Sequence, residues 1–286
     1  MHRRTLLSLP ALGGLAVLTA CADDSDEEEP SVPKSETGGR TITYGDDPAQ
    51  YGELTLPTGG PRGVAVLVHG GFWKPEYGIE YATPLVPSLV QAGWATWAIE
   101  YRRGTGAADT LADVLAAIDA CPVDSDVVVG IGHSAGGHLV TWAAGHGGLT
   151  HVVSQAGVLD LTAAYDDALG GGAVEAFLGH PPGPADAEVD PIQQAPLDLP
   201  VWCVHGTSDQ FVPIEQSRSY VAAATAAGGT AELVEVEGDH FVVIDPDSDA
   251  WSTTLAHLDT LACGSRAAPT AAASRSSARS CGTCRR

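Results

Sequence analysis

The sequence predicts an α/β protein with a mostly parallel central sheet and helices on both faces. Short apolar runs rich in β-branched residues recur along the chain, which is the pattern of buried strands. Segments typical of amphipathic helices lie between them, and this alternation favours parallel strands joined by crossover helices. The chain has 286 residues, enough for one large domain with a substantial core, and no internal repeat is visible.

The first half of the predicted domain begins with an antiparallel strand pair at a sheet edge. Two alternating segments, residues 41–44 and 51–56, are separated by Gly-Asp-Asp-Pro. The next segment, residues 63–68, is continuously apolar and predicts a central strand. The elements expected to follow are a helix over residues 81–92, a strand over 94–99 and an amphipathic helix over 109–120.

A strand, a sharp turn and a helix are predicted around Ser134. The strand is the β-branched run that starts at Val127, and the helix runs from Ala135 to about Gly145. The turn between them, residues 132–136, has the pattern Gly-x-Ser-x-Gly. A serine there has a strained backbone and an exposed hydroxyl, and the two glycines let strand and helix pass closely. The helix N-terminus points backbone N–H groups at the site, which suits a developing oxyanion.

The second half continues the alternation and contains one long insertion. Residues 161–199 are rich in Gly, Pro and Ala, with short helical pieces near Asp166 and at 174–177. This segment is too long for a simple connection and predicts a cap or lid over a site. The other expected elements are strands over 151–155, 201–204 and 231–236 and helices over 214–227 and 246–261.

Three residues that follow predicted strands suggest a catalytic triad. A serine is a poor nucleophile until a histidine takes its proton, and an acid orients that histidine. Ser134, Asp209 and His240 occur in the order Ser, Asp, His, each beyond the carboxyl end of a strand. Asp160, after an intervening strand, is the alternative acid, whereas Asp239 is too close to His240 in sequence to orient it well.

Four other histidines near these motifs are expected to have structural roles. His69 precedes a glycine loop and is expected to hold that loop by hydrogen bonds. His133 and His138 flank the serine turn and are expected to pack or bond locally. His205 lies at the end of an apolar strand, where a structural role is also expected.

Four segments resemble the α/β-hydrolase superfamily, over about residues 51–261. The sequence looks most similar to HGG-type esterases, feruloyl-esterase-like proteins and kynurenine formamidases, whose oxyanion loop reads HGGxW. The branch related to hormone-sensitive lipase has a third glycine where this chain has Phe72, which favours the formamidase and feruloyl-esterase side. The four segments are His69-Gly-Gly-Phe-Trp73, Gly132-His-Ser-Ala-Gly-Gly-His138, His205-Gly-Thr-Ser-Asp-Gln-Phe-Val-Pro213 and Gly238-Asp-His-Phe241.

The resemblance also implies which groups bind the oxyanion of an acyl-transfer reaction. They are the backbone N–H groups of Gly71, Phe72 and Ala135. Phe72, Trp73 and Tyr101, together with residues of the segment 161–199, are expected to line the substrate pocket. No cofactor and no metal ion are expected, because the triad supplies nucleophile, base and orienting acid.

These features favour a serine hydrolase that cleaves carboxylic esters through an acyl-enzyme, in an α/β-hydrolase fold. The alternative is an arylformamidase that acts on an N-formylkynurenine-type formamide, which the segment 69–73 supports. A prolyl-oligopeptidase-like peptidase shares the order of the triad, but no propeller domain is expected here. A non-catalytic, hydrolase-like binding protein is a hypothesis of another class, although such proteins usually lack a triad member and none is missing.

The charge of the chain limits its partners. The formal net charge is −22, and residues 41–263 contain 29 acidic against 5 basic side chains. Such a surface repels nucleic acid and anionic lipid headgroups, so neither is expected as a partner, although the charge does not identify a substrate. The expected partner, a small-molecule ester or amide, follows from the motifs above.

The two ends of the chain differ in composition from the domain at residues 41–263. Residues 1–21 have a basic start, an apolar stretch and the ending Leu-Thr-Ala-Cys, which resembles a bacterial lipobox. This implies cleavage before Cys21, lipid on its thiol and attachment to the outer face of a bacterial cytoplasmic membrane; ordinary secretion is the alternative. Residues 22–40 are an acidic linker, and residues 264–286 are a basic tail expected to be disordered.

The cysteines indicate no metal or redox centre. Cys203 lies in an apolar strand and is expected to be a small buried side chain. Cys121 and Cys263 lie at expected helix ends, where a disulfide is conceivable in an exported protein. The lone pair Cys281 and Cys284 has no second pair of ligands for a metal.

Overall fold

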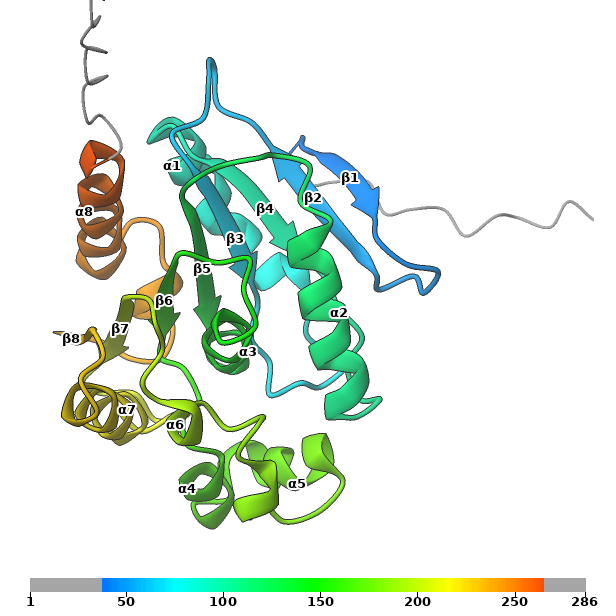
Figure 1. Cartoon of the computed structure of the whole chain (residues 1–286), viewed down its shortest axis with the longest axis vertical. Coiled ribbons are helices and arrows are strands. Elements are labelled where there is room, and N and C mark those ends of the chain that lie inside the picture. Colours follow the sequence, from blue (N-terminus) through cyan, green and yellow to red (C-terminus); the bar gives the residue numbers. More distant parts are fainter. Residues whose placement is uncertain (1–37, 265–286) are drawn as a thin grey trace, which may run out of the picture. The chain divides into compact units, whose positions relative to one another are not determined.

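Eight strands form one sheet in the part of the chain that the computed structural model describes, residues 38–264. The strands are β1 (Arg40–Thr43), β2 (Tyr51–Thr55), β3 (Val64–Val68), β4 (Ala95–Ile99), β5 (Val128–His133), β6 (His151–Gln155), β7 (Val201–Gly206) and β8 (Ala231–Val236). Their order is β1-β2-β4-β3-β5-β6-β7-β8 (Figure 1). The strands β1 and β2 are antiparallel to their neighbours, and the other pairs are parallel. The predicted mostly parallel sheet with an antiparallel edge is therefore confirmed.

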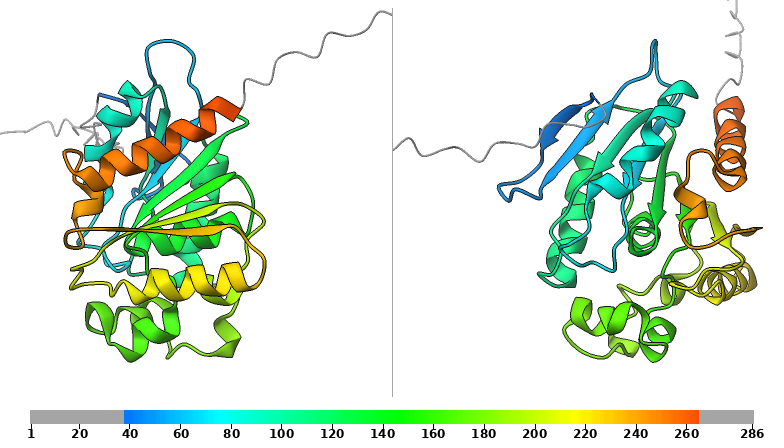
Figure 2. Two further views of the ribbon diagram at one scale, coloured as in Figure 1. Left: turned by 90° about the vertical axis from the view of Figure 1, so that its left-hand side faces the viewer. Right: turned by 180° about the vertical axis from the view of Figure 1, so that it is seen from behind.

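Helices cover both faces of this sheet (Figure 2). One hydrophobic core joins the sheet to α2, α3 and α7, and a second core joins the opposite face to α1 and α8. The α-helices are α1 (Val86–Gln91), α2 (Ala107–Asp119), α3 (Ala135–Ala144), α4 (Leu161–Asp166), α5 (Ala173–Leu178), α6 (Pro191–Gln194), α7 (Glu215–Ala226) and α8 (Asp249–Gly264). Five 3₁₀ turns complete the described residues: η1 (Ile79–Tyr81), η2 (Thr83–Leu85), η3 (Leu169–Gly171), η4 (Pro184–Asp186) and η5 (Val242–Ile244).

The central strand β3 shows why the sheet needs helices on both sides. Its five residues are all buried, and successive side chains point to opposite faces. Val66 belongs to the core that contains Leu139 of α3, whereas Leu67 belongs to the core that contains Leu89 of α1 and Trp251 of α8. Burying one such side chain contributes about 1.5–3 kcal/mol, so a continuous apolar strand favours the doubly covered position.

The helix expected over residues 81–92 is interrupted. The structure has η1, η2 and the short helix α1 in this region. Pro84 lies in the first turn of η2 and Pro87 in the first turn of α1. Proline has no N–H to continue a helical hydrogen-bond ladder and disfavours a helical conformation in the preceding residue, so each proline starts a new segment.

The insertion between β6 and β7 lies beyond the carboxyl ends of the parallel strands, where Figure 1 shows α4 and α5. Two side chains of α3 hold it: His138 Nε2 lies 2.9 Å from the carbonyl oxygen of Val189, and Trp142 Nε1 donates to the carbonyl oxygen of Glu188 at 2.9 Å. This segment, residues 161–199, is therefore docked on α3.

Several predictions about the chain ends and the cysteines concern residues that the structure does not describe. The expected signal peptide, Cys21, residues 22–37 of the linker and residues 265–286 of the tail lie outside them. Between residues 38 and 264, no helix is both long and apolar enough to cross a membrane. Cys203 is buried, as expected, and Cys121 and Cys203 are both free. The side chain of Cys263 lies outside the described part of the chain.

Candidate active site

Ser134 lies at the sharp turn between β5 and α3. Its backbone has φ 56° and ψ −121°, a strained conformation for a residue with a side chain. A Cβ atom added at Gly136 would lie 2.1 Å from the carbonyl oxygen of Val68, and one added at Gly132 would lie 2.1 Å from that of Gly136. The glycines two residues before and after the serine are therefore required by close backbone contact, as the sequence pattern predicts.

Asp209 and His240 meet at the ends of the neighbouring strands β7 and β8. His240 Nδ1 lies 2.6 Å from Asp209 Oδ2. The other carboxylate oxygen, Oδ1, accepts the backbone N–H groups of Phe211 at 2.8 Å and Val212 at 2.9 Å. The Asp209 side chain is completely buried, so its orientation toward the imidazole is set by these contacts.

A second histidine contacts the same carboxylate. His205 Nε2 lies 3.2 Å from Asp209 Oδ2, and His205 Nδ1 lies 2.8 Å from the Ser217 hydroxyl. Burial raises the pKa of Asp209, but hydrogen bonds from His205 and His240 together hold that pKa below its ordinary value. The sequence did not predict that His205 contacts Asp209. The signal was their spacing, because His205 lies at the end of β7 and Asp209 follows it four residues later.

Ser134 and His240 line one pocket of about 120 Å³. The predicted nucleophile, the predicted base and three residues of the predicted oxyanion loop are thus brought together from the ends of β3, β5 and β8. The pocket is lined by Gly70, Gly71, Phe72, Tyr77, Tyr81, His133, Ser134, Phe211, His240 and Phe241.

The pocket has an aromatic mouth, formed by Tyr77, Tyr81, Phe211 and Phe241. These four side chains are between 36% and 50% exposed, and Leu56 is the other exposed large apolar side chain among the described residues. The rings form two edge-to-face pairs, Tyr77 with Tyr81 at 5.6 Å and Phe211 with Phe241 at 5.5 Å between centroids. Sequence reasoning did not select these residues, although Phe211 and Phe241 lie within two positions of Asp209 and His240.

The glycine loop after β3 lies against the serine turn. A Cβ atom added at Gly70 would lie 2.9 Å from Ser134 Cβ. Gly71, Phe72 and Trp73 all have positive φ angles, of 109°, 51° and 55°. Within residues 38–264, no hydrogen bond engages the backbone N–H of Phe72 or of Ala135. Two of the three N–H groups predicted to bind the oxyanion, those of Phe72 and Ala135, are therefore available as donors.

Two residues expected in the substrate pocket lie elsewhere. Tyr101 is completely buried, and its hydroxyl donates to the carbonyl oxygen of His69 at 2.8 Å. Trp73 is 3% exposed and stacks on Phe177 of α5 at 4.4 Å between centroids. Tyr101 therefore supports the residue that precedes the glycines, and Trp73 packs against α5, so neither ring lines the pocket of Ser134.

The segment expected to form a lid over the site, residues 161–199, does not cover the pocket of Ser134. The segment 161–199 contributes Ala173, Ala176 and Phe177 to a neighbouring cavity of about 170 Å³, and it contributes no residue to the pocket of Ser134. Phe72 lines both cavities, and a Cβ atom added at Gly170 would lie 2.7 Å from its ring. The segment therefore packs on the far side of Phe72.

The other acids and histidines have separate partners. Asp160, the alternative acid, accepts the backbone N–H of Ala163 at 2.9 Å and caps α4. His133 Nε2 lies 2.9 Å from the carbonyl oxygen of His240. Burial and the charge of His240 lower the pKa of His133 to about 3, so the ring is neutral near pH 7 and can donate to that carbonyl.

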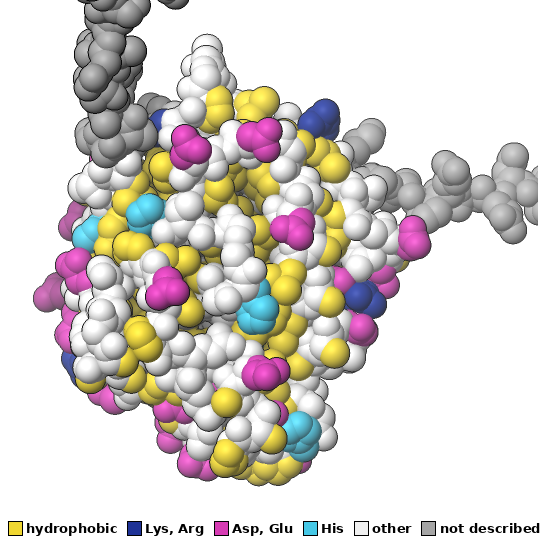
Figure 3. All heavy atoms as spheres, viewed as in Figure 1, with side chains coloured by type: hydrophobic (Ala, Val, Ile, Leu, Met, Phe, Trp, Pro, Cys, Tyr) yellow, Lys and Arg dark blue, Asp and Glu magenta, His cyan; other side chains and the backbone are white. Residues whose placement is uncertain are grey.

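Charged ligand groups have few partners at this site. The pocket lining contains no Asp, Glu, Lys or Arg. Among residues 38–264, no three His, Cys, Asp or Glu side chains are grouped to hold a metal ion. Figure 3 shows acidic side chains spread over one face of the molecule with few basic ones, in keeping with the strongly negative net charge.

The strand order, the strained serine after β5 and the acid–histidine pair after β7 and β8 define an α/β hydrolase. This confirms the resemblance seen in the motifs. The chain belongs to the prolyl oligopeptidase family, whose model matches residues 93–257.

Individual proteins are similar to this chain in sequence or in structure. Esterase LipC of Mycobacterium tuberculosis is 28% identical over 223 residues, an alignment that covers 64% of this chain and 54% of LipC. The chain thus spans about half the length of this curated relative. Among solved structures, a truncated carbohydrate esterase from gut microbiota has a TM-score of 0.67 at 17% identity, over 80% of this chain and 99% of that one. Esterase Est2 of Thermogutta terrifontis, with propionate bound, has a TM-score of 0.66 at 24% identity, over 81% and 96%.

Proposed function

We propose that the protein hydrolyses carboxylic esters through a covalent acyl-enzyme on Ser134. The main support is that Ser134 and His240 line one pocket while His240 binds Asp209 at 2.6 Å. Further support comes from the names of relatives: LipC is an esterase, and Est2 has been described phosphonylated by sarin.

In the proposed first step, the Oγ atom of Ser134 attacks the acyl carbon and His240 Nε2 takes the serine proton. Asp209 holds Nδ1–H and stabilises the imidazolium that forms. The C–O bond to the alcohol then breaks, and His240 returns its proton to the leaving alkoxide oxygen. An alcohol leaves and Ser134 carries the acyl group as an ester.

The second step reverses these roles with water. His240 takes a proton from water, whose oxygen attacks the acyl carbon, and then gives that proton to Ser134 Oγ as the acyl–serine bond breaks. A carboxylic acid is released. In both steps the backbone N–H groups of Gly71, Phe72 and Ala135 stabilise the oxyanion, which is typically the largest single contribution to such catalysis.

The pocket favours small, uncharged esters with an aromatic or apolar group. Its aromatic mouth offers apolar area, and no basic side chain in its lining would pair with an anionic substrate. The same aromatic lining also suits an arylformamide, the second candidate, because formamide hydrolysis can use the same triad and oxyanion donors.

The test is a set of initial rates on phenyl acetate, 4-nitrophenyl butyrate, a feruloyl ester, N-formylkynurenine and a prolyl-peptide anilide. Faster turnover of esters, abolished by Ser134→Ala, is expected. The control is Ser154→Ala, a buried serine on β6 whose hydroxyl has no partner among the described residues. Preference for N-formylkynurenine or the anilide would replace the esterase proposal, and activity that survives Ser134→Ala would refute the nucleophile. Absence of any turnover would favour a binding protein.

We also propose that the enzyme is exported and attached to a bacterial membrane through lipid on Cys21. The proposal rests on the ending Leu-Thr-Ala-Cys of the apolar N-terminal stretch. Cys21→Ser should move the full chain from the membrane fraction to the soluble fraction, and an unchanged membrane fraction would contradict the proposal.

A further inference from the structure

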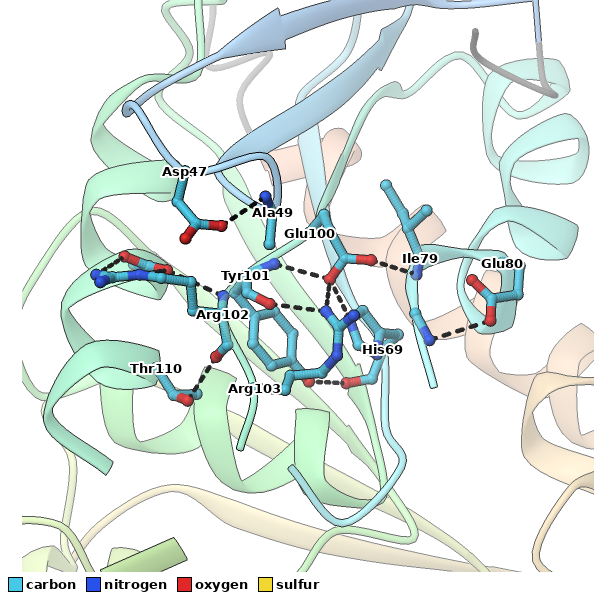
Figure 4. A network of polar contacts seen from close by, with 12 residues as sticks. Asp47, Ala49, His69, Ile79, Glu80, Glu100, Tyr101, Arg102, Arg103 and Thr110 are labelled. Carbon is cyan, nitrogen blue, oxygen red and sulfur yellow. Dashed lines mark hydrogen bonds and ion pairs between the residues drawn. The ribbon is translucent and has the colours of Figure 1, made fainter. Parts of the chain in front are cut away.

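One carboxylate is bound to both ends of the loop that carries the predicted oxyanion donors (Figure 4). Glu100, directly after β4, has its Oε1 atom 3.0 Å from His69 Nε2. Its other oxygen, Oε2, accepts the backbone N–H of Ile79 at 3.0 Å. His69 begins and Ile79 ends the segment 69–79, so Glu100 joins the two ends of the loop that contains Gly71 and Phe72.

The contact with His69 is fixed by its surroundings. The His69 ring is fully buried and stacks on Tyr101, with 4.4 Å between centroids and 12° between planes. Nδ1 lies 2.8 Å from the carbonyl oxygen of Gly70, so both neighbours of the ring are acceptors. Burial and the charge of Arg103 lower the pKa of His69 to about 3, which leaves one N–H near pH 7. The Glu100 carboxylate is the stronger acceptor and receives it.

The negative charge of Glu100 is also compensated. Arg103 forms an ion pair with Oε1, and the backbone N–H of Tyr101 donates to the same oxygen at 2.8 Å. A buried carboxylate is costly unless it is paired and hydrogen-bonded, and here the carboxylate is both. Figure 4 shows these donors converging on Glu100 from the glycine loop, from the segment after β4 and from the start of η1.

The loop needs such external contacts because its own backbone is strained. Gly71, Phe72 and Trp73 are consecutive residues with positive φ angles, which residues other than glycine rarely adopt. Strained segments persist only where the surrounding structure holds them. At the other side of the loop, Gly70 lies against Ser134, so a shift of the loop would move the donors relative to the nucleophile.

We propose that Glu100 is a positioning residue for the hydrolytic reaction, because it binds His69 and Ile79 and so holds the backbone N–H groups of Gly71 and Phe72 beside Ser134. This inference rests on the proposed ester hydrolysis. Glu100 does not contact the pocket itself, so its effect acts through the loop. The quantity expected to change is kcat, since the donors act mainly in the transition state.

The experiment compares Glu100→Gln with Glu100→Asp in the full chain, using 4-nitrophenyl acetate. Glutamine keeps the side-chain length and one acceptor oxygen, which can still accept from His69, although its NH2 group cannot accept from Ile79. Aspartate keeps the charge for Arg103 but is too short to span both ends. If the length of the side chain determines the position of the loop, Glu100→Gln retains kcat within about tenfold. Glu100→Asp then loses about 100-fold in kcat, with KM changed less than threefold. If aspartate retains more activity than glutamine, charge decides and the proposal is wrong.

Asp113 on α2 provides a matched control. It is a buried acid that binds the Arg102 guanidinium at 2.7 Å and the Arg102 backbone N–H at 2.9 Å, but it does not contact the glycine loop. Asp113→Asn should lower Tm while leaving kcat within about twofold. If Asp113→Asn loses as much kcat as Glu100→Asp, the effect of Glu100→Asp comes from lost stability of the fold. That result would refute the proposal.

A second measurement separates this proposal from the proposed function. A fluorophosphonate reagent labels a reactive serine and uses the same oxyanion donors, so Glu100→Asp should slow labelling of Ser134 in parallel with kcat. A wild-type protein that neither hydrolyses esters nor is labelled at Ser134 would refute the proposed function and the role of Glu100 with it. An active wild type, with Glu100→Asp equally active, would refute the role of Glu100 alone.

Discussion

Asp209 Oδ2 lies 2.6 Å from His240 Nδ1, although the two residues are 31 positions apart in sequence. The contact forms because β7 and β8 are parallel neighbours, so the loops after their carboxyl ends meet at one edge of the sheet. A hydrogen bond at this distance to a buried carboxylate is strong and directional, and it selects the tautomer with the proton on Nδ1.

Replacing this acid should therefore affect catalysis far more than folding. Asp209→Asn is expected to lower kcat about 10³- to 10⁴-fold, because the amide favours the wrong imidazole tautomer. The control is Asp160→Asn, which alters the N-cap of α4 and should cost about 1 kcal/mol or less of stability, with little change in kcat. Steady-state kinetics on 4-nitrophenyl acetate distinguish them, and a larger loss in Asp160→Asn would reassign the acid.

Gly136, two residues after Ser134, should tolerate no side chain. In Gly136→Ala the new Cβ would lie 2.1 Å from the carbonyl oxygen of Val68, a backbone atom that cannot move away without displacing β3. The substitution is expected to destabilise the fold by about 3 kcal/mol or more. Gly60→Ala is the control, because a Cβ atom there meets nothing within 4 Å. Urea unfolding measures both, and a cost below about 1 kcal/mol for Gly136→Ala would contradict the close contact.

The aromatic mouth should determine affinity for aryl substrates. Phe211→Ala removes one ring of the Phe211–Phe241 pair and is expected to raise KM for phenyl acetate about five- to tenfold, with a smaller effect on ethyl acetate. Leu56→Ala, an exposed apolar side chain outside the pocket, is the matched control and should leave KM unchanged. Equal effects on the aryl and alkyl esters would argue against contact of this ring with the substrate.

Buried histidines should make the fold sensitive to mild acid. Burial lowers the pKa of His138 to about 4, whereas an unfolded histidine has a pKa of about 6.5. Between these values the unfolded chain binds a proton that the folded protein does not, so the stabilising contribution is complete above pH 6.5 and is lost as the pH falls toward 4.

His138→Gln should reduce this pH dependence. The slope of the unfolding free energy between pH 6 and 4.5 is expected to become shallower by up to about 1.4 kcal/mol per pH unit. Glutamine keeps a side-chain N–H that can donate to the carbonyl oxygen of Val189, the partner of His138. Urea titrations at several pH values measure the slope, and identical slopes in the two proteins would show that His138 is protonated equally in both states.

Local features of the site were predictable from sequence because local geometry determines them. The strained turn at Ser134 requires glycine at positions 132 and 136, and the structure shows both glycines in backbone contact. The continuous apolar runs predicted buried strands, since a strand covered on both faces excludes polar side chains. The interrupted helix before β4 was the main local error, although Pro84 and Pro87 already indicated breaks.

Which distant residues meet was decided by the tertiary structure. Sequence order left Asp160 open as the acid, and only the pairing of β7 with β8 brings Asp209 to His240. Tyr101 follows a strand in the way a pocket residue does, yet the fold packs its ring against His69.

The sequence by itself therefore determined the class of fold, the sharp turn at Ser134 and the order of the candidate catalytic residues, because backbone sterics and the burial of apolar strands act over a few residues. The tertiary structure alone decided that the segment 161–199 packs beyond Phe72, that aromatic rings surround the pocket and that Glu100 joins both ends of the glycine loop. These contacts depend on sheet order and side-chain packing between segments far apart in the chain, and no local pattern encodes them.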